Sequence, residues 1–443
     1  MIMKKFIDRK DELKSLEEML DKKGSGIIVI YGRRRVGKTR LVLEAIKRRK
    51  NFYYLATETR NIDGFARLLT ERFPEFSRYK KDWEILIEKL ENKVDVLVLD
   101  EFPYIIQEDK GIISMLQRLV DTRLKKMKII LTGSTISTMA SKVLAYKSPL
   151  YGRRIGDIKL KQMSFFDAIE FFPGEDAKKL VEIYGFADGI PFYLERISGD
   201  FWEWLDKELK NPGSFIKNEG DFLLKYEFEE TAVYKAILEA IANGKTRRKE
   251  ILDYVGVKGD IGQYLKNLIE LGFVHREVPV TENKIRTKRG RYYLSDNFLK
   301  FWFRFIQPNM SYIEMKVFGA KDIKKNYNQY LGSVFEEIGR EYLLKKIRKG
   351  EVEKMKVGRW WHKDKEIDVV GIGKNLAIFG EAKWRDNIDA YKIARSLEDK
   401  VKYIKWVGDY ELWIFGKSFR RRLNEINGVK VKCIDINEMI NYK

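Results

Sequence analysis

The sequence predicts an α/β protein in which a parallel sheet is covered by helices on both faces and is followed by helical and further α/β segments. Three observations support this fold class. Strand patterns rich in β-branched residues alternate with helical patterns over residues 27–134, which is typical of parallel sheets. A glycine-framed loop at 32–39 separates the first strand pattern from the helical pattern after it. A second group of strand patterns, at 356–384, follows an amphipathic helical pattern.

Composition restricts the classes of function. The chain has 443 residues, enough for about two to four domains. Its formal net charge of +21 favours polyanionic partners, with nucleic acid (here expected to be DNA) first and an anionic membrane second; a basic protein without such a partner is the alternative. A single cysteine and two histidines argue against a disulfide and a His/Cys metal site. No apolar run approaches about 18 residues and the charged N-terminus is unlike a secretory signal, so we expect a cytoplasmic protein with no membrane span.

The loop at 32–39 has the surroundings of a phosphate-binding loop. An apolar run at 27–31 precedes it and a helical pattern at 38–46 follows, the strand–loop–helix order that such a loop requires. Its glycines let backbone N–H groups converge on phosphate oxygens. Lys38 is expected to reach the β- and γ-phosphates, and the Thr39 hydroxyl to ligate Mg²⁺. The alternative is a basic surface turn. The predicted nucleotide contacts are Gly32, Arg33, Arg34, Arg35, Val36, Gly37, Lys38, Thr39 and Arg40.

Two acids follow a later strand pattern of the same sheet. Asp100 and Glu101 end the apolar run at 94–99, about 60 residues after the loop, and ligands of parallel sheets bind at the carboxyl ends of the strands. Asp100 is expected to hold Mg²⁺, and Glu101 to orient and deprotonate the water that attacks the γ-phosphate. A solvated strand end is the alternative. Ser134, after the next strand pattern, either senses the γ-phosphate or caps the next helix.

Three later residues are candidates for completing this site. Arg153 and Arg154 are suited to neutralising charge on the transferring phosphoryl group, in cis or from a neighbouring subunit of a homo-oligomer; a basic surface pair is the alternative. Gly-Ile-Pro at 189–191 predicts a sharp turn. Pro191 either lies on the nucleotide or serves only this turn.

The remaining chain divides into further domains. Helical patterns at 230–243, 246–255 and 260–271, followed by strand patterns at 273–278 and 291–295, predict a winged helix with its recognition helix at 260–269. The basic loop between the strands suits phosphate contacts, and protein contact is the alternative. An aromatic stretch at 296–305 predicts a buried linker helix; a stacking platform for bases is the alternative. The predicted domains are the core at 1–160, a helical lid at 161–228, the winged helix at 229–297, linker helices at 298–327 and a C-terminal α/β domain at 328–443.

The C-terminal domain contains a second candidate site. Asp368 and Glu381 lie on adjacent strand patterns, and the period of two puts Glu381 and Lys383 on one face. These carboxylates are expected to ligate a divalent metal, with Glu337 or its neighbour Glu336 completing the shell, and Lys383 to position water or neutralise charge. A sheet face with a solvated ion pair is the alternative. Candidates for holding the substrate backbone are Arg359, His362 and Lys363.

Taken together, the chain resembles an archaeal P-loop ATPase family related to the AAA+ and signal-transduction (STAND) ATPases. The motifs that carry the resemblance are Phe-Ile-Asp-Arg at 6–9, the loop at 31–39, Leu-Asp-Glu-Phe at 99–102, Thr-Gly-Ser at 132–134, Tyr-Gly-Arg-Arg at 151–154, Gly-Ile-Pro at 189–191, Phe-Glu-Glu at 335–337, Glu-Ile-Asp at 366–368 and Glu-Ala-Lys at 381–383. The resemblance implies a P-loop NTPase parallel sheet with a helical lid, a winged-helix domain and a restriction-endonuclease-like C-terminal domain. It also implies ATP/ADP with Mg²⁺ as cofactors, and Asp8 and Arg9 near the adenine.

These observations predict an ATPase that couples nucleotide state to DNA binding and to metal-dependent DNA cleavage. In a second hypothesis, a nucleotide-dependent switch binds protein or DNA through an inactive C-terminal domain. In a third, a basic ATPase acts at an anionic membrane.

Overall fold

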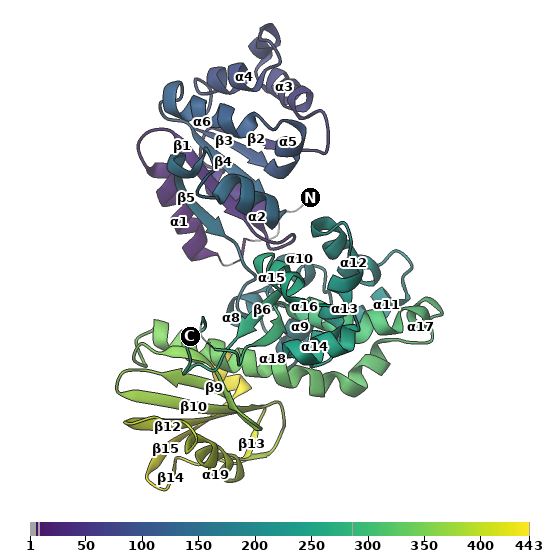
Figure 1. Cartoon of the computed structure of the whole chain (residues 1–443), viewed down its shortest axis with the longest axis vertical. Coiled ribbons are helices and arrows are strands. Elements are labelled where there is room, and N and C mark those ends of the chain that lie inside the picture. The colour runs from purple at the N-terminus through teal and green to yellow at the C-terminus, as the bar shows by residue number, and fades with distance from the viewer. Residues whose placement is uncertain (1–5, 8, 286, 443) are drawn as a thin grey trace. The chain divides into compact units, whose positions relative to one another are not determined.

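The computed structural model describes residues 6, 7, 9–285 and 287–442. The chain divides into two compact units, which can be followed by colour in Figure 1. Unit 1 is Met1–Gln162 with Ile190–Phe192, and unit 2 is Met163–Gly189 with Tyr193–Lys443.

Unit 1 is built on a parallel five-stranded sheet with the order β2-β3-β4-β1-β5. The strands are β1 (Gly26–Tyr31), β2 (Asn51–Leu55), β3 (Val96–Asp100), β4 (Lys128–Gly133) and β5 (Arg154–Lys159). Every residue of β3 and β4 is buried, because apolar clusters cover both faces of the sheet. Figure 1 shows the helices that pack on these faces. The predicted α/β class with a parallel sheet is therefore confirmed.

Helices connect these strands. They are α1 (Lys10–Asp21), α2 (Lys38–Ile46), α3 (Asn61–Arg72), α4 (Trp83–Leu90), α5 (Phe102–Glu108), α6 (Ile112–Thr122) and the short α7 (Ile136–Thr138). The strand β5 was not predicted, because it is an edge strand with only one fully buried residue and therefore lacks a clear apolar pattern.

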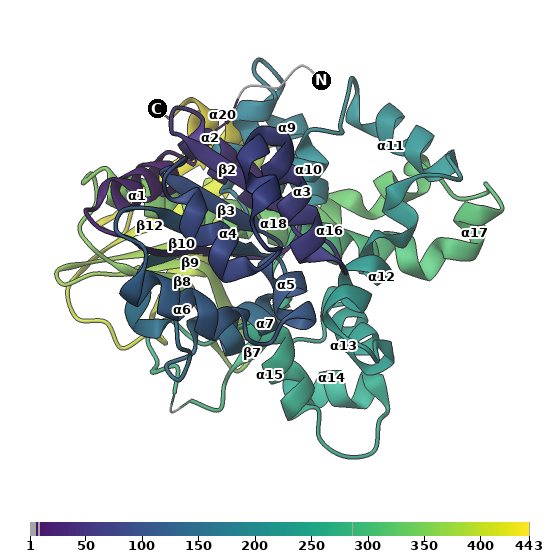
Figure 2. The same ribbon diagram turned by 90° about the horizontal axis from the view of Figure 1, so that it is seen from above.

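The first part of unit 2 is helical, as the sequence predicts. Its helices are α8 (Phe165–Ala168), α9 (Ala177–Ala187), α10 (Pro191–Leu194, which begins in unit 1), α11 (Phe201–Lys210) and α12 (Phe215–Glu227). Three helices and an antiparallel hairpin follow, α13 (Ala232–Ala242), α14 (Arg248–Val255), α15 (Gly262–Glu270), β6 (Val274–Glu277) and β7 (Arg291–Leu294). The three helices pack together (Figure 2).

The aromatic stretch after the hairpin is part of the core. It forms α16 (Asn297–Phe301) and the π-helical turn η5 (Trp302–Ile306). Phe298, Phe301 and Trp302 are completely buried, which confirms the predicted buried linker and leaves no aromatic surface there for stacking bases. The short α17 (Met310–Glu314) follows.

The C-terminal part of unit 2 is a six-stranded mixed sheet with the order β14-β15-β12-β10-β9-β8. Its strands are β8 (Lys356–His362), β9 (Lys365–Ile372), β10 (Leu376–Lys383), β12 (Asp409–Gly416), β14 (Glu425–Ile426) and β15 (Val429–Asp435), with β11 (Ile388–Asp389) and β13 (Phe419–Arg421) in a separate pair. Its helices are α18 (Ala320–Arg348), α19 (Ala390–Val401) and α20 (Ile436–Asn441). Gly339 of α18 faces Val369 and Phe415, whereas Leu397 of α19 joins the core of the other face. The helices α18 and α19 can be followed on the two faces of this sheet in Figure 1. No helix within the described part of the chain is both long and apolar enough to cross a membrane.

A carboxyl group links α18 to the preceding helices and predicts a pH-dependent stability. Glu341 accepts hydrogen bonds from the Phe165 backbone N–H at 2.7 Å and the Tyr184 hydroxyl at 3.4 Å. Burial, with a contribution from Asp188, raises the pKa of Glu341 to about 8. The folded state therefore binds more protons than the unfolded state above the ordinary pKa of glutamate, and the free energy of unfolding falls as pH rises towards 8.

Replacement of this group tests that expectation. Glu341→Gln keeps a hydrogen-bond acceptor but does not titrate. We therefore expect the change in the free energy of unfolding caused by this substitution to be more favourable at about pH 9 than at about pH 5, by about 1–2 kcal/mol. Urea unfolding at both pH values measures the difference. An effect of equal size at the two pH values would contradict the assignment.

Candidate functional site

The predicted phosphate loop curls tightly between β1 and α2. Gly37, the residue before α2, has φ 95°, which glycine adopts at little cost. A Cβ on Gly32 would stand 2.2 Å from the carbonyl oxygen of Leu160, so only glycine fits there. Lys38 is buried, and its Nζ donates to the carbonyls of Gly32 at 2.9 Å and Arg33 at 3.0 Å. The ammonium group thus lies inside the curve of the loop, where a phosphate would be held.

Asp100 lies at the carboxyl end of β3 and contacts the start of α2. Its Oδ2 accepts from the Thr39 hydroxyl at 2.7 Å and the Tyr53 hydroxyl at 2.6 Å. Its Oδ1 accepts from the Glu101 backbone N–H at 3.0 Å and from the Thr132 hydroxyl. A hydroxyl and a carboxylate held together are the oxygen donors that Mg²⁺ takes in P-loop enzymes. These residues therefore fit the predicted cofactor.

Glu101 is fixed directly beside Asp100. It has a left-handed backbone, φ 53°, which is uncommon for a non-glycine residue and concentrates at functional sites. Its carboxylate accepts from the Ser134 hydroxyl at 2.6 Å and the Ser134 backbone N–H at 3.1 Å. Ser134 therefore holds the candidate base; sensing of the γ-phosphate by Ser134 stays a prediction.

Tyr53 is a site residue that sequence reasoning missed. It lies on β2, next to β3 in the sheet, and donates to Asp100. Burial and the charge of Asp100 raise the pKa of Tyr53, so the hydroxyl stays a donor. The only sequence signal was an aromatic residue near the end of a strand pattern, which more often indicates core.

Two other predicted nucleotide contacts lie against the same loop. Arg9 is buried, and its guanidinium donates to the carbonyls of Val36 at 3.2 Å and Lys161 at 2.5 Å. Pro191 packs beside Gly37, with its Cγ 3.7 Å from where a Cβ on that glycine would lie. Asp8 lies outside the described residues.

Two arginines of the loop contact aromatic side chains. Arg34 reaches the Tyr104 hydroxyl at 3.4 Å, and the Arg35 guanidinium stacks 3.6 Å from the Phe192 ring. Arg40 lies in the first turn of α2. Their predicted contact with the nucleotide stays a prediction.

Arg153 and Arg154 are not brought to the phosphate loop within the chain. Arg154 pairs in register with Ile27, at the beginning of β1, whereas the loop follows its end. Arg153 binds Asp121 at 2.8–3.1 Å, and Arg154 contacts Asp157 at 3.2 Å. This position does not support a role in cis, because the arginines lie at the start of β5 and the loop follows the opposite end of its neighbour β1. Their supply from a neighbouring subunit stays a prediction.

The second predicted site does bring its central residues together. Lys383 Nζ lies 2.7 Å from Glu381 Oε1 and 3.9 Å from Asp368 Oδ2. Asp368 also accepts from the Ala382 backbone N–H at 3.1 Å. Lys400 of α19, which sequence reasoning missed, binds both oxygens of Glu381 at 3.0 and 2.8 Å. Its helix lies beyond the motif, so spacing could not reveal it.

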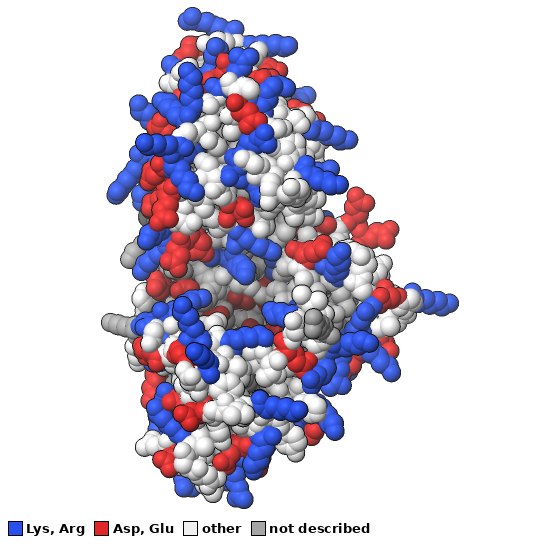
Figure 3. Space-filling model, turned by 60° about the vertical axis from the view of Figure 1, so that its left-hand side comes forward, with Lys and Arg blue, Asp and Glu red and all other residues white. Residues whose placement is uncertain are grey.

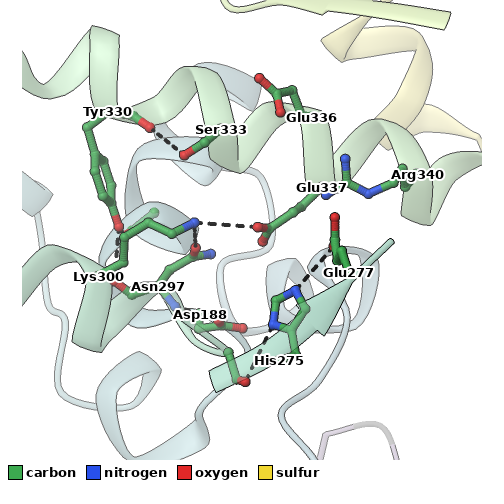
Figure 4. A network of polar contacts seen from close by, with 12 residues as sticks. Asp188, His275, Glu277, Asn297, Lys300, Tyr330, Ser333, Glu336, Glu337 and Arg340 are labelled. Atoms are coloured by element: carbon green, nitrogen blue, oxygen red, sulfur yellow. Dashed lines mark hydrogen bonds and ion pairs between the residues drawn. The ribbon is translucent and has the colours of Figure 1, made fainter. Parts of the chain in front are cut away.

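The contribution of α18 differs from the prediction. Glu337 contacts Lys300 at 3.4 Å and lies among the interior polar groups drawn in Figure 4, whereas Glu336 leaves the helix in another direction. Of these two helix acids, Glu336 is the one whose charge acts on Asp368. The structure therefore does not bring Glu337 to the candidate metal ligands, because residues adjacent in a helix point about 100° apart.

Protonation of this cluster depends on its acids and on Lys383. Burial, with the charges of Glu336 and Glu381, raises the pKa of Asp368 to about 7. Burial alone would lower the pKa of Lys383, but Glu381 and Asp368 outweigh it and raise that pKa. Across residues 6–7, 9–285 and 287–442, no group of three His, Cys, Asp or Glu side chains is arranged to hold a metal. The predicted metal ligands fit a metal only if both Lys383 and Lys400 move away from Glu381.

Arg359 is not available to a substrate backbone. It is buried, lies 3.0 Å from Glu336 and 3.7 Å from Glu277, and stacks 4.7 Å from the Tyr293 ring. Lys363 is exposed.

Comparison with known proteins identifies the N-terminal segment. Residues 6–197 match a family described as an ATPase domain predominantly from Archaea. Residues 302–394 match a family described as archaeal and bacterial proteins of unknown function. The solved Walker-type ATPase PABY2304 of Pyrococcus abyssi shares the fold, with a TM-score of 0.53 and 22% identity over 68% of this chain and 96% of that one.

Two relatives from Methanocaldococcus jannaschii match in sequence. The uncharacterized ATP-binding protein MJ0423 is 42% identical over 45 residues, which cover 10% of this chain and 76% of that protein. The uncharacterized protein MJECL04 is 47% identical over 430 residues, which cover 95% of this chain and 97% of that protein. The chain therefore belongs to the family of MJECL04. Its residues 6–197 are an archaeal ATPase domain, which confirms this part of the predicted resemblance.

Proposed function

We propose that the protein is a Mg²⁺-dependent ATPase whose nucleotide state controls DNA binding by unit 2. The observation that carries the proposal is the series of contacts that joins Thr39, Asp100, Glu101 and Ser134 beside the phosphate loop. Lys38 neutralises phosphate charge, and Glu101 takes a proton from the attacking water. Mg²⁺, when bound by Thr39 and Asp100, supplies further neutralisation of the phosphates. Release of phosphate from ATP that requires Mg²⁺ tests the proposal, and its absence with and without DNA would refute the hydrolytic part.

The turn at 188–193 supports communication between nucleotide and unit 2. Pro191 lies against Gly37 of the phosphate loop. Asp188, three residues earlier, accepts from the Asn297 backbone N–H at 2.7 Å inside unit 2, and Gly189 accepts from the Met163 N–H at 2.8 Å. A loop that changes shape between ATP and ADP would displace a segment whose neighbours are anchored in unit 2. This fits a STAND-type switch.

The three helices and hairpin of unit 2 support DNA as the partner. Their order is that of a winged helix, and the hairpin loop is basic. The net charge of +21 favours a polyanion of the same kind.

Cleavage of DNA by the C-terminal domain is the second part of the proposal. In it, Asp368 and Glu381 bind a divalent metal after Lys400 releases Glu381 and Lys383 turns towards the substrate. Lys383→Ala is expected to lower Mg²⁺- or Mn²⁺-dependent cleavage by about 10²–10³-fold, since it removes a charge that stabilises the transition state. Gel assays on duplex, branched and single-stranded DNA measure this. Lys374→Ala, an exposed lysine before β10, is the matched control.

A non-cleaving switch is the second candidate function, and one observation favours it. Lys383 and Lys400 already bind the two oxygens of Glu381, which is suited to a structural ion cluster. If the wild-type protein cleaves none of the three DNA substrates with either metal, this candidate stands and cleavage is refuted.

A further inference from the structure

We infer that a basic groove in unit 2 holds the phosphate backbone of duplex DNA; the assignment rests on the DNA binding proposed above and gives it a site. The groove has a volume of about 660 Å³. Eight of its twelve lining residues are Lys or Arg, and none is Asp or Glu. On the molecular face in Figure 3, by contrast, acidic and basic side chains are interspersed. The all-basic lining of the groove therefore differs from the mixed charges on that face.

The groove is assembled from three elements that are distant in sequence. The start of α14 contributes Arg247, Arg248 and Lys249. The β6–β7 hairpin contributes Arg276, Lys288, Arg289 and Arg291. The β8–β9 turn of the C-terminal sheet contributes Lys363, beside Trp361. A row of cations from separate elements suits an extended polyanion better than a single small anion.

Part of the groove is a fixed framework. Arg276 donates to the carbonyls of Lys284 at 3.0 Å and Thr287 at 2.8 Å, which holds the hairpin loop in shape. Arg289 Nη1 lies 3.0 Å from His362 Nδ1 and so joins the loop to β8. The framework is thus shaped by contacts within the protein.

Four of the arginines are also partly neutralised. Arg291 binds Glu366 at 2.7 Å, and Arg247 lies 3.8 Å from Glu250. Arg248 forms an ion pair with Asp260, and Arg289 forms one with Glu282. They contribute less net charge to the groove than their number suggests.

Three lysines supply charge that no acid compensates. Lys249, Lys288 and Lys363 are exposed, and one comes from each element of the groove. Among the described residues, none of the three forms an ion pair with a carboxylate. An exposed, uncompensated lysine gains most from a phosphate because it gives up no existing partner and releases a counterion from DNA.

The predicted recognition helix is less suited to binding DNA than the groove is. The helix α15 carries one cation, Lys266, which lies 3.9 Å from Glu270. It does not line the groove. The proposed contact is therefore to the backbone rather than to base edges, and it should depend little on DNA sequence.

The test uses the full chain with Lys249, Lys288 and Lys363 changed to Gln. Fluorescence anisotropy with random-sequence duplex DNA, at salt concentrations from about 50 to about 200 mM, measures affinity and its salt dependence. Each lost phosphate contact should reduce the slope of log K against log salt by about 0.9. We expect a slope smaller by about 2–3 and an affinity lower on the order of a hundredfold at about 0.1 M salt. The matched control changes Lys225, Lys374 and Lys392, exposed lysines outside the groove, and should bind like the wild type.

The outcomes separate the groove from the proposed function. Wild-type binding that the groove variant retains unchanged would overturn the groove but not DNA binding. No DNA binding by the wild type would overturn both. Equal losses in the groove and control variants would show a non-local charge effect and overturn the groove. Binding to vesicles of equal parts phosphatidylserine and phosphatidylcholine that exceeds binding to DNA, and that the groove variant loses, would overturn DNA as the occupant. Unchanged thermal unfolding and ATP turnover without DNA show that the variants fold.

Discussion

Lys38→Ala is expected to lower ATP turnover by at least about 10²–10³-fold, the usual effect of removing one group that stabilises transition-state charge. The ammonium group of Lys38 lies in the curve of the phosphate loop, 2.9–3.0 Å from two of its carbonyls. In that position it can follow the negative charge that moves between the β- and γ-phosphates during transfer. Alanine leaves the loop without this charge. Steady-state phosphate release at saturating Mg·ATP measures the loss.

Lys47→Ala is the matched control for this variant. Lys47 directly follows α2, the helix that begins at Lys38, and it is exposed. Within the described residues, its only ion pair is with Glu44. It removes the same charge from unit 1 and should leave turnover within about twofold of the wild type, since exposed ion pairs contribute little. Normal turnover by Lys38→Ala would refute the assignment of the phosphate loop.

Glu101→Gln should separate hydrolysis from binding. The Glu101 carboxylate accepts hydrogen bonds from Ser134 at 2.6 and 3.1 Å. These two bonds fix its position in the site. Glutamine can keep a contact to Ser134 but cannot take a proton from water. We expect turnover to fall by about 10²–10⁴-fold, the range for loss of a general base, while ATP affinity stays near that of the wild type.

Binding and turnover must be measured on the same Glu101→Gln sample. Calorimetric titration with ATP gives the affinity, and single-turnover hydrolysis gives the chemical step. Glu71→Gln, an exposed helical carboxylate of unit 1, controls for the loss of one negative charge. A parallel loss of binding and hydrolysis would mean that Glu101 supports the structure of the site rather than the proton transfer.

Local signals were sufficient for the phosphate loop but not for its supports. The strand, the glycines and the helix are consecutive in the chain, so the order strand, loop and helix can be predicted from residues 27–46 alone. Tyr53 and the pairing of Ser134 with Glu101 depend on the lateral order of strands in the sheet, which no single segment encodes. The same dependence applies to Arg153 and Arg154. They lie at the start of the edge strand β5, which was not predicted, so the sequence could not show that they lie at the other end of the strands from the phosphate loop.

In the C-terminal domain, strand period predicted more than helix phase. The alternation along β10 correctly places Glu381 and Lys383 side by side. The choice between Glu336 and Glu337 depended on the rotation of α18 against the sheet, and either acid fitted an amphipathic pattern. Lys400 approaches from α19, whose packing on β10 brings together residues that are distant in sequence.

The affinity of the purified wild-type protein for ATP, with and without Mg²⁺, tests most directly whether the loop at 32–39 holds a triphosphate. We predict saturable binding of one ATP per chain, with a dissociation constant on the order of micromolar to millimolar, tighter with Mg²⁺ because Thr39 and Asp100 then share the metal. Absence of ATP binding in the presence of Mg²⁺ would contradict the account.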